Sequence, residues 1–340
     1  MLKIIYLLES TCLCGGVKVV FRQAEALIRR GHRVTIICSE DYPGWFYGRV
    51  PYMKQDPFDS RAADDADWIL GTTPRLILAH SARPDVSSRL VHLIQGYEPD
   101  IRECEAYLSV IHQAYSLSIP KITVSGSMAR TFDCRYPGHR FVSVGQGLET
   151  DYFYPAAGFS LPLPQVDRLF LVGPLSISFK QLRTGLTACS RVRQYYPDMK
   201  LIRISPVDTR EEEEALIGRI DEYHVQVPPE EVGHMLRSGS GILLSSSDHG
   251  EGFGLPAVEA MACGVPAALT DILSYRTFSD PCDYAEFAPS GNPDALAEAV
   301  CVLISDPVKR EHHIKRGLEV AAQFSYGRVA EAIEGVLYRA

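Results

Sequence analysis

The chain has 340 residues, of which 46% are hydrophobic and 22% are charged, and its formal net charge is −8. This length suits two domains of ordinary size, and the composition is that of a globular protein. Residues 1–150 hold 17 basic and 16 acidic side chains, whereas residues 151–340 hold 17 and 26, so neither half has the basic excess of a nucleic-acid-binding protein.

The first predicted elements form a β-α-β unit. Residues 3–8 (KIIYLL) are a short apolar run, which is typical of a buried strand. A turn containing Gly15 and Gly16 follows, and then a stretch with apolar residues at helical spacing that ends at Gly31. Residues 33–39 (RVTIICS) form the next predicted strand. A glycine turn between the first strand and the first helix is typical of a doubly wound α/β sheet.

The N-terminus is a poor signal peptide, because Lys3 interrupts its apolar run and Glu9 ends it. No segment approaches the ~20 consecutive apolar residues of a membrane span. Nine cysteines are scattered without a C-x-x-C pair, which predicts reduced thiols. We therefore expect a cytoplasmic protein.

The same architecture is predicted twice along the chain. Further strands of the first half are expected within 68–73, 90–95 and 121–125. A proline-rich passage at 152–168 indicates a linker. After it, a strand, a helix and another strand follow within 169–205, so two α/β domains are expected.

An acidic run extends from Glu211 to Glu214. Thr209 and Glu212 have the spacing of a capping box, and acidic residues in the first turn of a helix are stabilised by its dipole. We expect these carboxylates on the solvated surface of a helix rather than in a metal site.

The stretch DHGEGFGLPAVEAMACGVP, residues 248–266, places Glu251 in a glycine-bearing loop and Glu259 within a helix. A strand at 241–247 precedes the loop, so the loop lies at the carboxyl edge of a parallel sheet, where such folds bind ligands. Backbone N–H groups at a helix start attract phosphate, and glycines permit close approach. A carboxylate can accept two hydrogen bonds from a sugar diol, so this pattern favours a nucleotide sugar as the ligand.

This stretch resembles the E-x7-E signature of the family 4 retaining glycosyltransferases, which have the GT-B fold. Other segments resemble parts of the same family in the same order: 15–37 its glycine loop and first helix, 142–155 the end of its first domain, and 324–337 its final helix. The resemblance covers nearly the whole chain. Residues 90–101 (LVHLIQGYEPDI) also resemble a subset that includes rhamnosyltransferases.

The resemblance implies two Rossmann-like domains that face each other across a cleft. An acceptor-binding domain would cover residues 1–155, together with a C-terminal helix at 323–340 that crosses back onto it. Residues 156–164 would be the linker, and residues 165–322 would bind the nucleotide sugar.

The resemblance also implies roles for individual residues. Glu259 would hold the ribose hydroxyls and Glu251 the transferred sugar, while Lys180 would oppose the charge that develops on the diphosphate. Glu251 and Lys180 would be the catalytic residues. The full donor-binding set expected from the resemblance is Gly15, Gly16, Gln95, Lys180, Arg183, Glu251, Gly252, Phe253, Gly254, Leu255 and Glu259.

The chain departs from the family at the phosphate-binding arginine, whose matching position is Pro174. Arg183 is one candidate replacement, and Ser176 with Ser178 is another.

A second departure lies in the first domain. Many relatives place a histidine near the donor hexose, and the matching position here is Gln95. His80 and His92 are the nearest alternatives, and we expect both to be structural. Residues 65–67 (DAD) resemble the metal-binding D-x-D of a different glycosyltransferase fold but precede a strand, so we expect loop acids there and no metal.

The expected function is that of a retaining, metal-independent hexosyltransferase of polysaccharide biosynthesis without a cofactor. Its partners would be a UDP-, GDP- or dTDP-linked sugar and a glycan, a lipid-linked or a small-molecule acceptor. No nucleic acid is expected, and nothing in the sequence indicates a membrane although association with one is possible. Two alternatives stay open. A GT-B nucleotide-sugar epimerase would need acid/base groups in the first domain, and a catalytically silent sugar-nucleotide binder is favoured by the loss of the arginine at Pro174.

Overall fold

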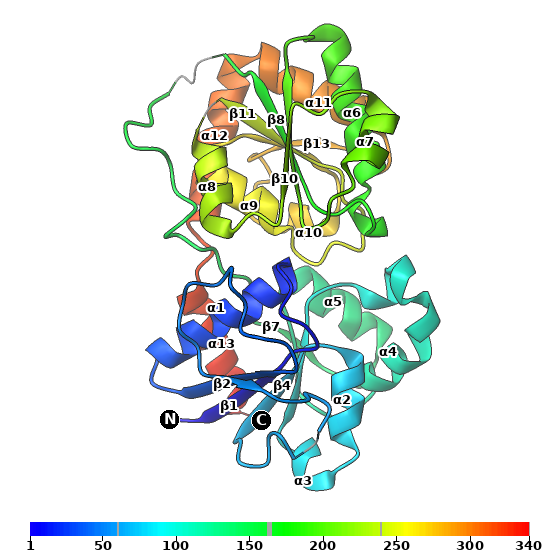
Figure 1. Cartoon of the computed structure of the whole chain (residues 1–340), viewed down its shortest axis with the longest axis vertical. Helices are drawn as coiled ribbons and strands as arrows, with labels where there is room; N and C mark the ends of the chain where they lie inside the picture. Colours follow the sequence, from blue (N-terminus) through cyan, green and yellow to red (C-terminus); the bar gives the residue numbers. More distant parts are fainter. Residues whose placement is uncertain (60, 162–164, 239, 340) are drawn as a thin grey trace. The chain divides into compact units, whose positions relative to one another are not determined.

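The computed structural model describes residues 1–59, 61–161, 165–238 and 240–339, and the chain forms two compact units (Figure 1). Unit 1 comprises Met1–Gly147 and Ser325–Ala340, and unit 2 comprises Leu148–Phe324. The first division falls at Gly147, ahead of the predicted residue 155. The predicted linker at 156–164 belongs to unit 2, and its residues 162–164 lie outside the described residues.

Within the described residues, unit 1 contains a seven-stranded parallel sheet in the order β3-β2-β1-β4-β5-β6-β7. Its strands are β1 (Lys3–Leu7), β2 (Arg33–Cys38), β3 (Tyr52–Lys54), β4 (Trp68–Gly71), β5 (Leu90–Ile94), β6 (Lys121–Thr123) and β7 (Phe141–Ser143). Its α-helices are α1 (Gly15–Arg29), α2 (Pro74–Ser81), α3 (Pro84–Ser87), α4 (Leu108–Tyr115), α5 (Gly126–Arg135) and α13 (Tyr326–Leu337), with 3₁₀ helices η1 (Glu98–Asp100) and η2 (Arg102–Tyr107).

The central strands of unit 1 form as their sequence predicts. Every residue of β5 is buried, as expected for a strand covered by helices on both faces. One prediction was wrong in detail: Gly15 and Gly16 are the first two residues of α1 and not part of the turn that precedes it. Their backbone N–H groups therefore belong to the first turn of a helix, which has no intrahelical acceptors for them.

Within the described part of unit 2, a six-stranded sheet has the order β10-β9-β8-β11-β12-β13, and all its pairs are parallel. Its strands are β8 (Arg168–Val172), β9 (Lys200–Ser205), β10 (Glu222–Val225), β11 (Gly241–Ser245), β12 (Ala267–Thr270) and β13 (Glu286–Ala288). Its α-helices are α6 (Leu182–Tyr195), α7 (Arg210–Ile217), α8 (Pro229–Arg237), α9 (Leu255–Ala262), α10 (Leu273–Arg276), α11 (Pro293–Ser305) and α12 (Pro307–Ala321), with the 3₁₀ helix η3 (Ser178–Lys180).

The two sheets share the strand order of a dinucleotide-binding fold. In each unit the first strand lies beside the fourth, in unit 1 as β1 and β4 and in unit 2 as β8 and β11. The chain reverses its winding direction at this switch point, so a crevice opens at the carboxyl ends of these two strands. The predicted fold class of two Rossmann-like α/β domains is confirmed.

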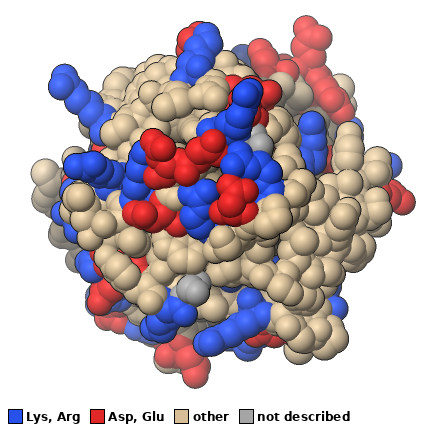
Figure 2. Space-filling model, turned by 90° about the horizontal axis from the view of Figure 1, so that it is seen from below, with Lys and Arg blue, Asp and Glu red and all other residues tan. Residues whose placement is uncertain are grey.

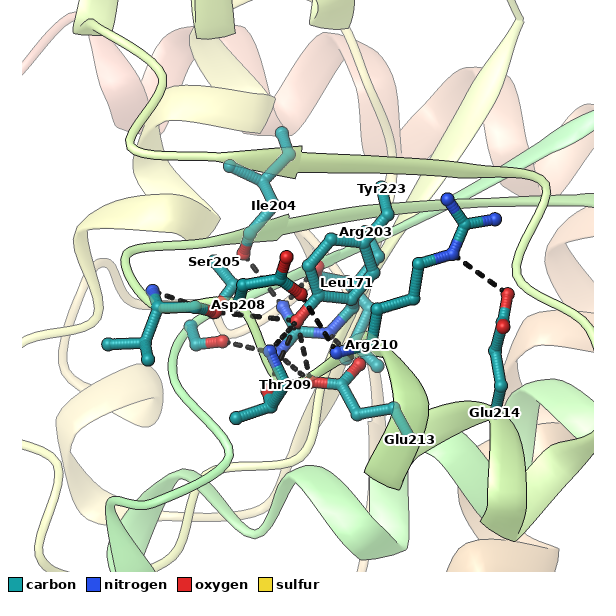
Figure 3. A network of polar contacts seen from close by, with 12 residues as sticks. Leu171, Arg203, Ile204, Ser205, Asp208, Thr209, Arg210, Glu213, Glu214 and Tyr223 are labelled. Carbon is teal, nitrogen blue, oxygen red and sulfur yellow. Dashed lines mark hydrogen bonds and ion pairs between the residues drawn. The ribbon is translucent and has the colours of Figure 1, made fainter.

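A buried ion pair lies beside the switch point of unit 2 (Figure 3). The side chains of Arg203 in β9 and Glu213 in α7 are both fully buried, and Arg203 Nε lies 2.7 Å from Glu213 Oε2. Nη1 of the same guanidinium donates to the carbonyl oxygens of Leu171 (3.1 Å) and Ile204 (2.7 Å), and Nη2 donates to Glu213 Oε1 (2.9 Å) and the Gly173 carbonyl (2.5 Å). All five donors of the guanidinium are thus occupied.

The prediction of a solvated acidic run is therefore wrong for Glu213, although Glu211 and Glu212 are exposed. Thr209 makes no side-chain capping bond and instead donates to Glu213 Oε1 at 2.8 Å. Tyr223 donates to the same oxygen at 3.2 Å. A buried arginine needs a carboxylate within reach, and the first turn of α7 supplies it.

The charged surface is mixed in sign. On the face that Figure 2 shows, basic and acidic side chains lie interspersed and do not form one extended field of either sign. Among the described residues, no helix is both long enough and apolar enough to cross a membrane.

Candidate functional site

Two loops meet at the switch point of unit 2. One follows β8 and contains η3 with Lys180, and the other follows β11 and contains Glu251. Because β8 and β11 are paired neighbours, their carboxyl ends bring these loops together although the two residues are 71 positions apart.

The loops are joined by an ion pair between the two predicted catalytic residues. Lys180 Nζ lies 2.6 Å from Glu251 Oε2, and 17% of the lysine side chain and 8% of the glutamate side chain are exposed. Ser247 Oγ donates to the same carboxylate oxygen at 2.9 Å. The charges are thus held in a mostly buried setting, in which electrostatic interactions are stronger than in water.

Backbone contacts fix the two loops against each other. Asp248 donates its N–H to the Phe179 carbonyl oxygen at 2.7 Å, and Ser246 Oγ donates to the Lys180 carbonyl oxygen at 2.9 Å. Gln181 Nε2 donates to Asp248 Oδ2 at 3.1 Å. The position of Lys180 therefore depends on the loop after β11 as well as on its own loop.

Lys180 can bind an anion without leaving Glu251. An ammonium group has three N–H donors, and the contact with Glu251 uses one of them. Two donors remain for a phosphate oxygen. The adjacent Phe179 ring, with its centroid 5.2 Å from Nζ, shields one side of the cation.

The glycine loop leads into α9 through Gly254. This residue has φ +93°, and a Cβ built on it would lie 2.1 Å from Cε1 of Tyr275. Only glycine fits both the left-handed backbone and the close approach of the ring. The side chain of Phe253 is buried against Phe278 and Phe324, which holds the segment from Gly252 to Leu255 at the N-terminus of α9.

Glu259 lies in the second turn of α9 and is 6% exposed, the same fraction as Glu251. Both predicted sugar-binding carboxylates are thus buried on either side of one helix start. Each carboxylate oxygen can accept more than one hydrogen bond, so ligand hydroxyls can add to the contacts that these side chains already make.

Of the candidates for the missing arginine, Arg183 points to another partner, and Ser178 lies in η3 beside Lys180. Arg183, in the first turn of α6, is paired with Glu212, and 60% of its side chain is exposed. Pro174 follows Gly173, whose carbonyl oxygen accepts from the buried Arg203. Ser176 is exposed. In this structure Lys180 is the cation at the candidate site that faces Glu251.

In unit 1, the predicted residues Gly16 and Gln95 lie together. A Cβ placed on Gly16 would meet the Gln95 side-chain amide at 3.4 Å from Nε2 and 3.5 Å from Oε1. Gln95 follows β5 and Gly15 opens α1, so all three residues lie at the carboxyl edge of the sheet. The Gln95 amide and the N–H groups of the first turn of α1 can donate hydrogen bonds to a polar ligand.

The histidines and the DAD sequence are structural. His80 is buried with Nε2 2.8 Å from the Pro57 carbonyl oxygen. His92 is fully buried, and burial lowers its pKa to about 3. Asp65 forms an ion pair with Lys3, and Asp67 accepts from the Lys3 N–H at 2.7 Å, so both serve the loop before β4.

Sequence reasoning missed several supporting residues. Tyr275 packs against Gly254 and its hydroxyl lies 2.6 Å from Ser245 Oγ, but nothing in its local sequence indicates this role. Ser247 could be found, because it directly follows a predicted strand. In unit 1, Glu98 accepts from the Tyr115 hydroxyl at 3.0 Å, and burial raises its pKa to about 7. Glu98 is thus a titratable carboxyl three residues beyond Gln95.

Comparison with known proteins identifies a family and relatives that this chain resembles. Residues 180–320 match the family model described as "Glycosyl transferases group 1". The chain is 24% identical over 238 residues to a phosphatidyl-myo-inositol mannosyltransferase of Mycobacterium leprae, a match that covers 67% of this chain and 61% of that protein. It is 23% identical over 357 residues to the protein of the same name from Mycobacterium tuberculosis, with 94% and 92% covered.

The fold also has solved counterparts. The Anabaena protein Alr3699/HepE, crystallised in complex with UDP-glucose, superposes with a TM-score of 0.78 at 14% identity, and all of both chains is covered. A likeness at this identity shows the fold, which is the GT-B arrangement of two parallel-sheet domains.

Proposed function

Because residues 180–320 match the glycosyl transferases group 1 model and the fold is that of GT-B enzymes, we propose that the chain transfers a hexosyl residue from a nucleotide-sugar donor with retention of anomeric configuration and without a metal ion. The observation that carries this proposal is the contact of Lys180 with Glu251 at the switch point of unit 2. It brings a cation with spare donors next to a carboxylate that can accept sugar hydroxyls.

The donor would bind along the start of α9. Glu259 would accept hydrogen bonds from the ribose hydroxyls, and Glu251 would accept them from the hexose. The diphosphate would lie between them, where the N–H groups of Phe253, Gly254 and Leu255 and the ammonium of Lys180 oppose its charge. Gly15, Gly16 and Gln95 of unit 1 stay predicted donor-binding residues, because they match the family's positions.

In the reaction, the bond between the anomeric carbon and the diphosphate oxygen breaks as the acceptor oxygen attacks from the same face. The proton of the acceptor hydroxyl moves to the leaving diphosphate oxygen, so no enzyme nucleophile is needed. Negative charge grows on the diphosphate, and preorganised donors aimed at that charge lower the barrier. Lys180 would supply this stabilisation in place of a metal ion.

The acceptor side is supported by the relatives. Two of them are named for mannosyl transfer to phosphatidyl-myo-inositol, and a structural neighbour is a complex with UDP-glucose. We propose a UDP-, GDP- or dTDP-linked hexose as donor, and a glycan or lipid-linked acceptor of polysaccharide biosynthesis. All nine cysteines are free thiols, which supports work in the reducing cytoplasm.

The test is a panel of UDP, GDP, dTDP and ADP and their sugar conjugates, read by thermal shift and then by transfer to acceptors. A ligand at 100 times its dissociation constant stabilises the folded state by ~2.7 kcal/mol. Transfer should persist in EDTA, and the product should have the anomeric configuration of the donor. Epimerisation of the donor without transfer would establish the epimerase instead, and binding with neither reaction would establish a silent binder. Loss of transfer in EDTA with recovery in Mg²⁺ or Mn²⁺ would contradict metal independence.

A further inference from the structure

Unit 1 contains a pocket of about 360 Å³ at the amino ends of β6 and β7. Three segments line it: residues 118–121 before and at the start of β6, residues 138–140 with Val142 around the start of β7, and Val336 with Arg339 at the end of α13. The strands are paired in register here, with Lys121 opposite Phe141. The amino ends of a parallel sheet lie at the edge opposite to Gln95, so this pocket is separate from the candidate donor site.

The pocket has one sign of charge. Its lining includes Lys121, His139, Arg140 and Arg339, and none of the described residues that line it is an aspartate or a glutamate. Arg140 and Arg339 are exposed. Several other arginines of the chain form ion pairs with carboxylates, such as Arg203 with Glu213. The arginines of this pocket have no carboxylate partner among the described residues, so their charge is available to a ligand.

Lys121 is the buried charge among these groups. The residue is 1% exposed, and among the described residues its ammonium donates to the backbone carbonyl oxygens of Leu117 and Ile119, the latter at 3.3 Å, and lies 5.5 Å from the centroid of the Phe141 ring. A buried charge without an opposite charge is costly, and burial lowers the pKa of Lys121 to about 8. An anion in the pocket would offset this cost.

We propose that this pocket binds a phosphate or diphosphate group, with Arg140 and Arg339 as its open guanidinium ligands and Lys121 as the buried charge behind them. Guanidinium groups match the geometry of phosphate oxygens through paired N–H donors. The volume lies in the range of small-molecule sites and exceeds that of a single inorganic ion, so the group is carried on a larger molecule. That molecule is a soluble phosphorylated compound or the headgroup of a lipid.

On the face that Figure 2 shows, basic and acidic side chains are interspersed and form no broad basic field. Where positive and negative side chains alternate, long-range attraction to an anion is weak and is screened within ~8 Å at physiological salt. Selectivity for phosphate would therefore come from the pocket itself. The inference is independent of glycosyl transfer.

The experiment follows the His139 ring by NMR in the full chain while pyrophosphate is added up to about 10 mM at constant ionic strength. His139→Gln identifies the resonance. We expect the chemical shift of the His139 ring to change saturably with pyrophosphate in the wild type. The same change is expected in Lys180→Ala, which lacks the cation of the donor site. In the double variant Arg140→Gln with Arg339→Gln, the dissociation constant should rise by about tenfold or more, because charge-assisted hydrogen bonds are lost.

The matched control is Arg33→Gln. Arg33 is exposed at the start of β2, at the same edge of the same sheet, and does not line the pocket, so its variant should bind as the wild type does. Binding to vesicles with and without phosphatidylglycerol then shows whether the phosphate group belongs to a lipid headgroup or to a soluble compound. Vesicle binding that fails in the double variant indicates a headgroup, and pyrophosphate binding without vesicle binding indicates a soluble ligand. No saturable shift, an equal loss in Arg33→Gln, or the loss of the shift in Lys180→Ala would overturn the proposal.

Discussion

Two ion pairs of unit 2 differ in what they leave unsatisfied: Arg203 with Glu213, between β9 and α7, and Lys180 with Glu251, between the loops that follow β8 and β11. The guanidinium of Arg203 uses all its donors on Glu213 and three carbonyl oxygens, and both side chains are fully buried. Lys180 uses one donor on Glu251 and keeps 17% of its side chain exposed. The saturated pair can only hold the fold together. The unsaturated pair can accept a ligand, because among the described residues Glu251 is the only hydrogen-bond partner of the Lys180 ammonium, which has two further donors.

The largest expected effect is the loss of folding stability when the ion pair of Arg203 with Glu213 is broken. Arg203→Met leaves the Glu213 carboxylate buried without its counter-charge, which typically costs about 3–5 kcal/mol. Urea unfolding measured against the wild type checks this value. Adding Glu213→Leu to Arg203→Met should recover most of the loss, since an apolar pair of similar volume replaces the charges. A single variant as stable as the wild type would show that the pair is not structural.

Breaking the pair of Lys180 with Glu251 should lower kcat more than it lowers the free energy of unfolding. Charge on the diphosphate grows as the glycosidic bond breaks, so Lys180→Ala removes an interaction that is strongest in the transition state. Loss of one such contact costs ~2.7–4 kcal/mol, or about 10²–10³ in kcat. The measurement is kcat together with donor Kd, and Kd should change less than kcat. If stability falls while kcat is preserved, Lys180 is only a structural partner of Glu251.

Glu259→Ala should weaken nucleotide binding by about tenfold or more, because hydrogen bonds to a charged acceptor contribute roughly 1.5–3 kcal/mol each. Titration with the free nucleoside diphosphate isolates this effect from hexose contacts. Unchanged affinity in a folded variant would remove Glu259 from the ribose site.

The smallest effect is expected at Arg183. Its partner Glu212 is as exposed as it is, and surface ion pairs contribute little. Arg183→Ala should leave kcat, donor affinity and thermal stability near wild type. A large loss of kcat here, with Lys180→Ala nearly unaffected, would show that the arginine leaves Glu212 on donor binding and takes the role assigned to the lysine.

The sequence predicts the two α/β domains and the Glu251 loop because both depend on local patterns: apolar runs, glycines and a helix start. The contact between Lys180 and Glu251 could not be predicted from spacing, since it exists only because β8 and β11 are neighbours in the folded sheet.

Two errors have physical causes. Glu213 looked like one of several surface carboxylates, and the missed signal was Arg203, a charge inside the apolar strand KLIRIS that needs a buried partner. The strands β3 and β7 were not predicted because three residues are too few to establish a period. Their positions at the edge of the sheet depend on pairing with β2 and β6.

Unit 1 is completed by residues that follow unit 2 in the chain. α13 packs on α1, Glu334 forms an ion pair with Arg30 and a hydrogen bond with His32, and Tyr326 packs against Gly147. On the ribosome, the whole of unit 2 is therefore synthesised before α13. The side of α1 that α13 covers stays exposed, or is held by a chaperone, until α13 emerges. A truncated chain that stops at Phe324 would have a complete second unit and an unfinished first one.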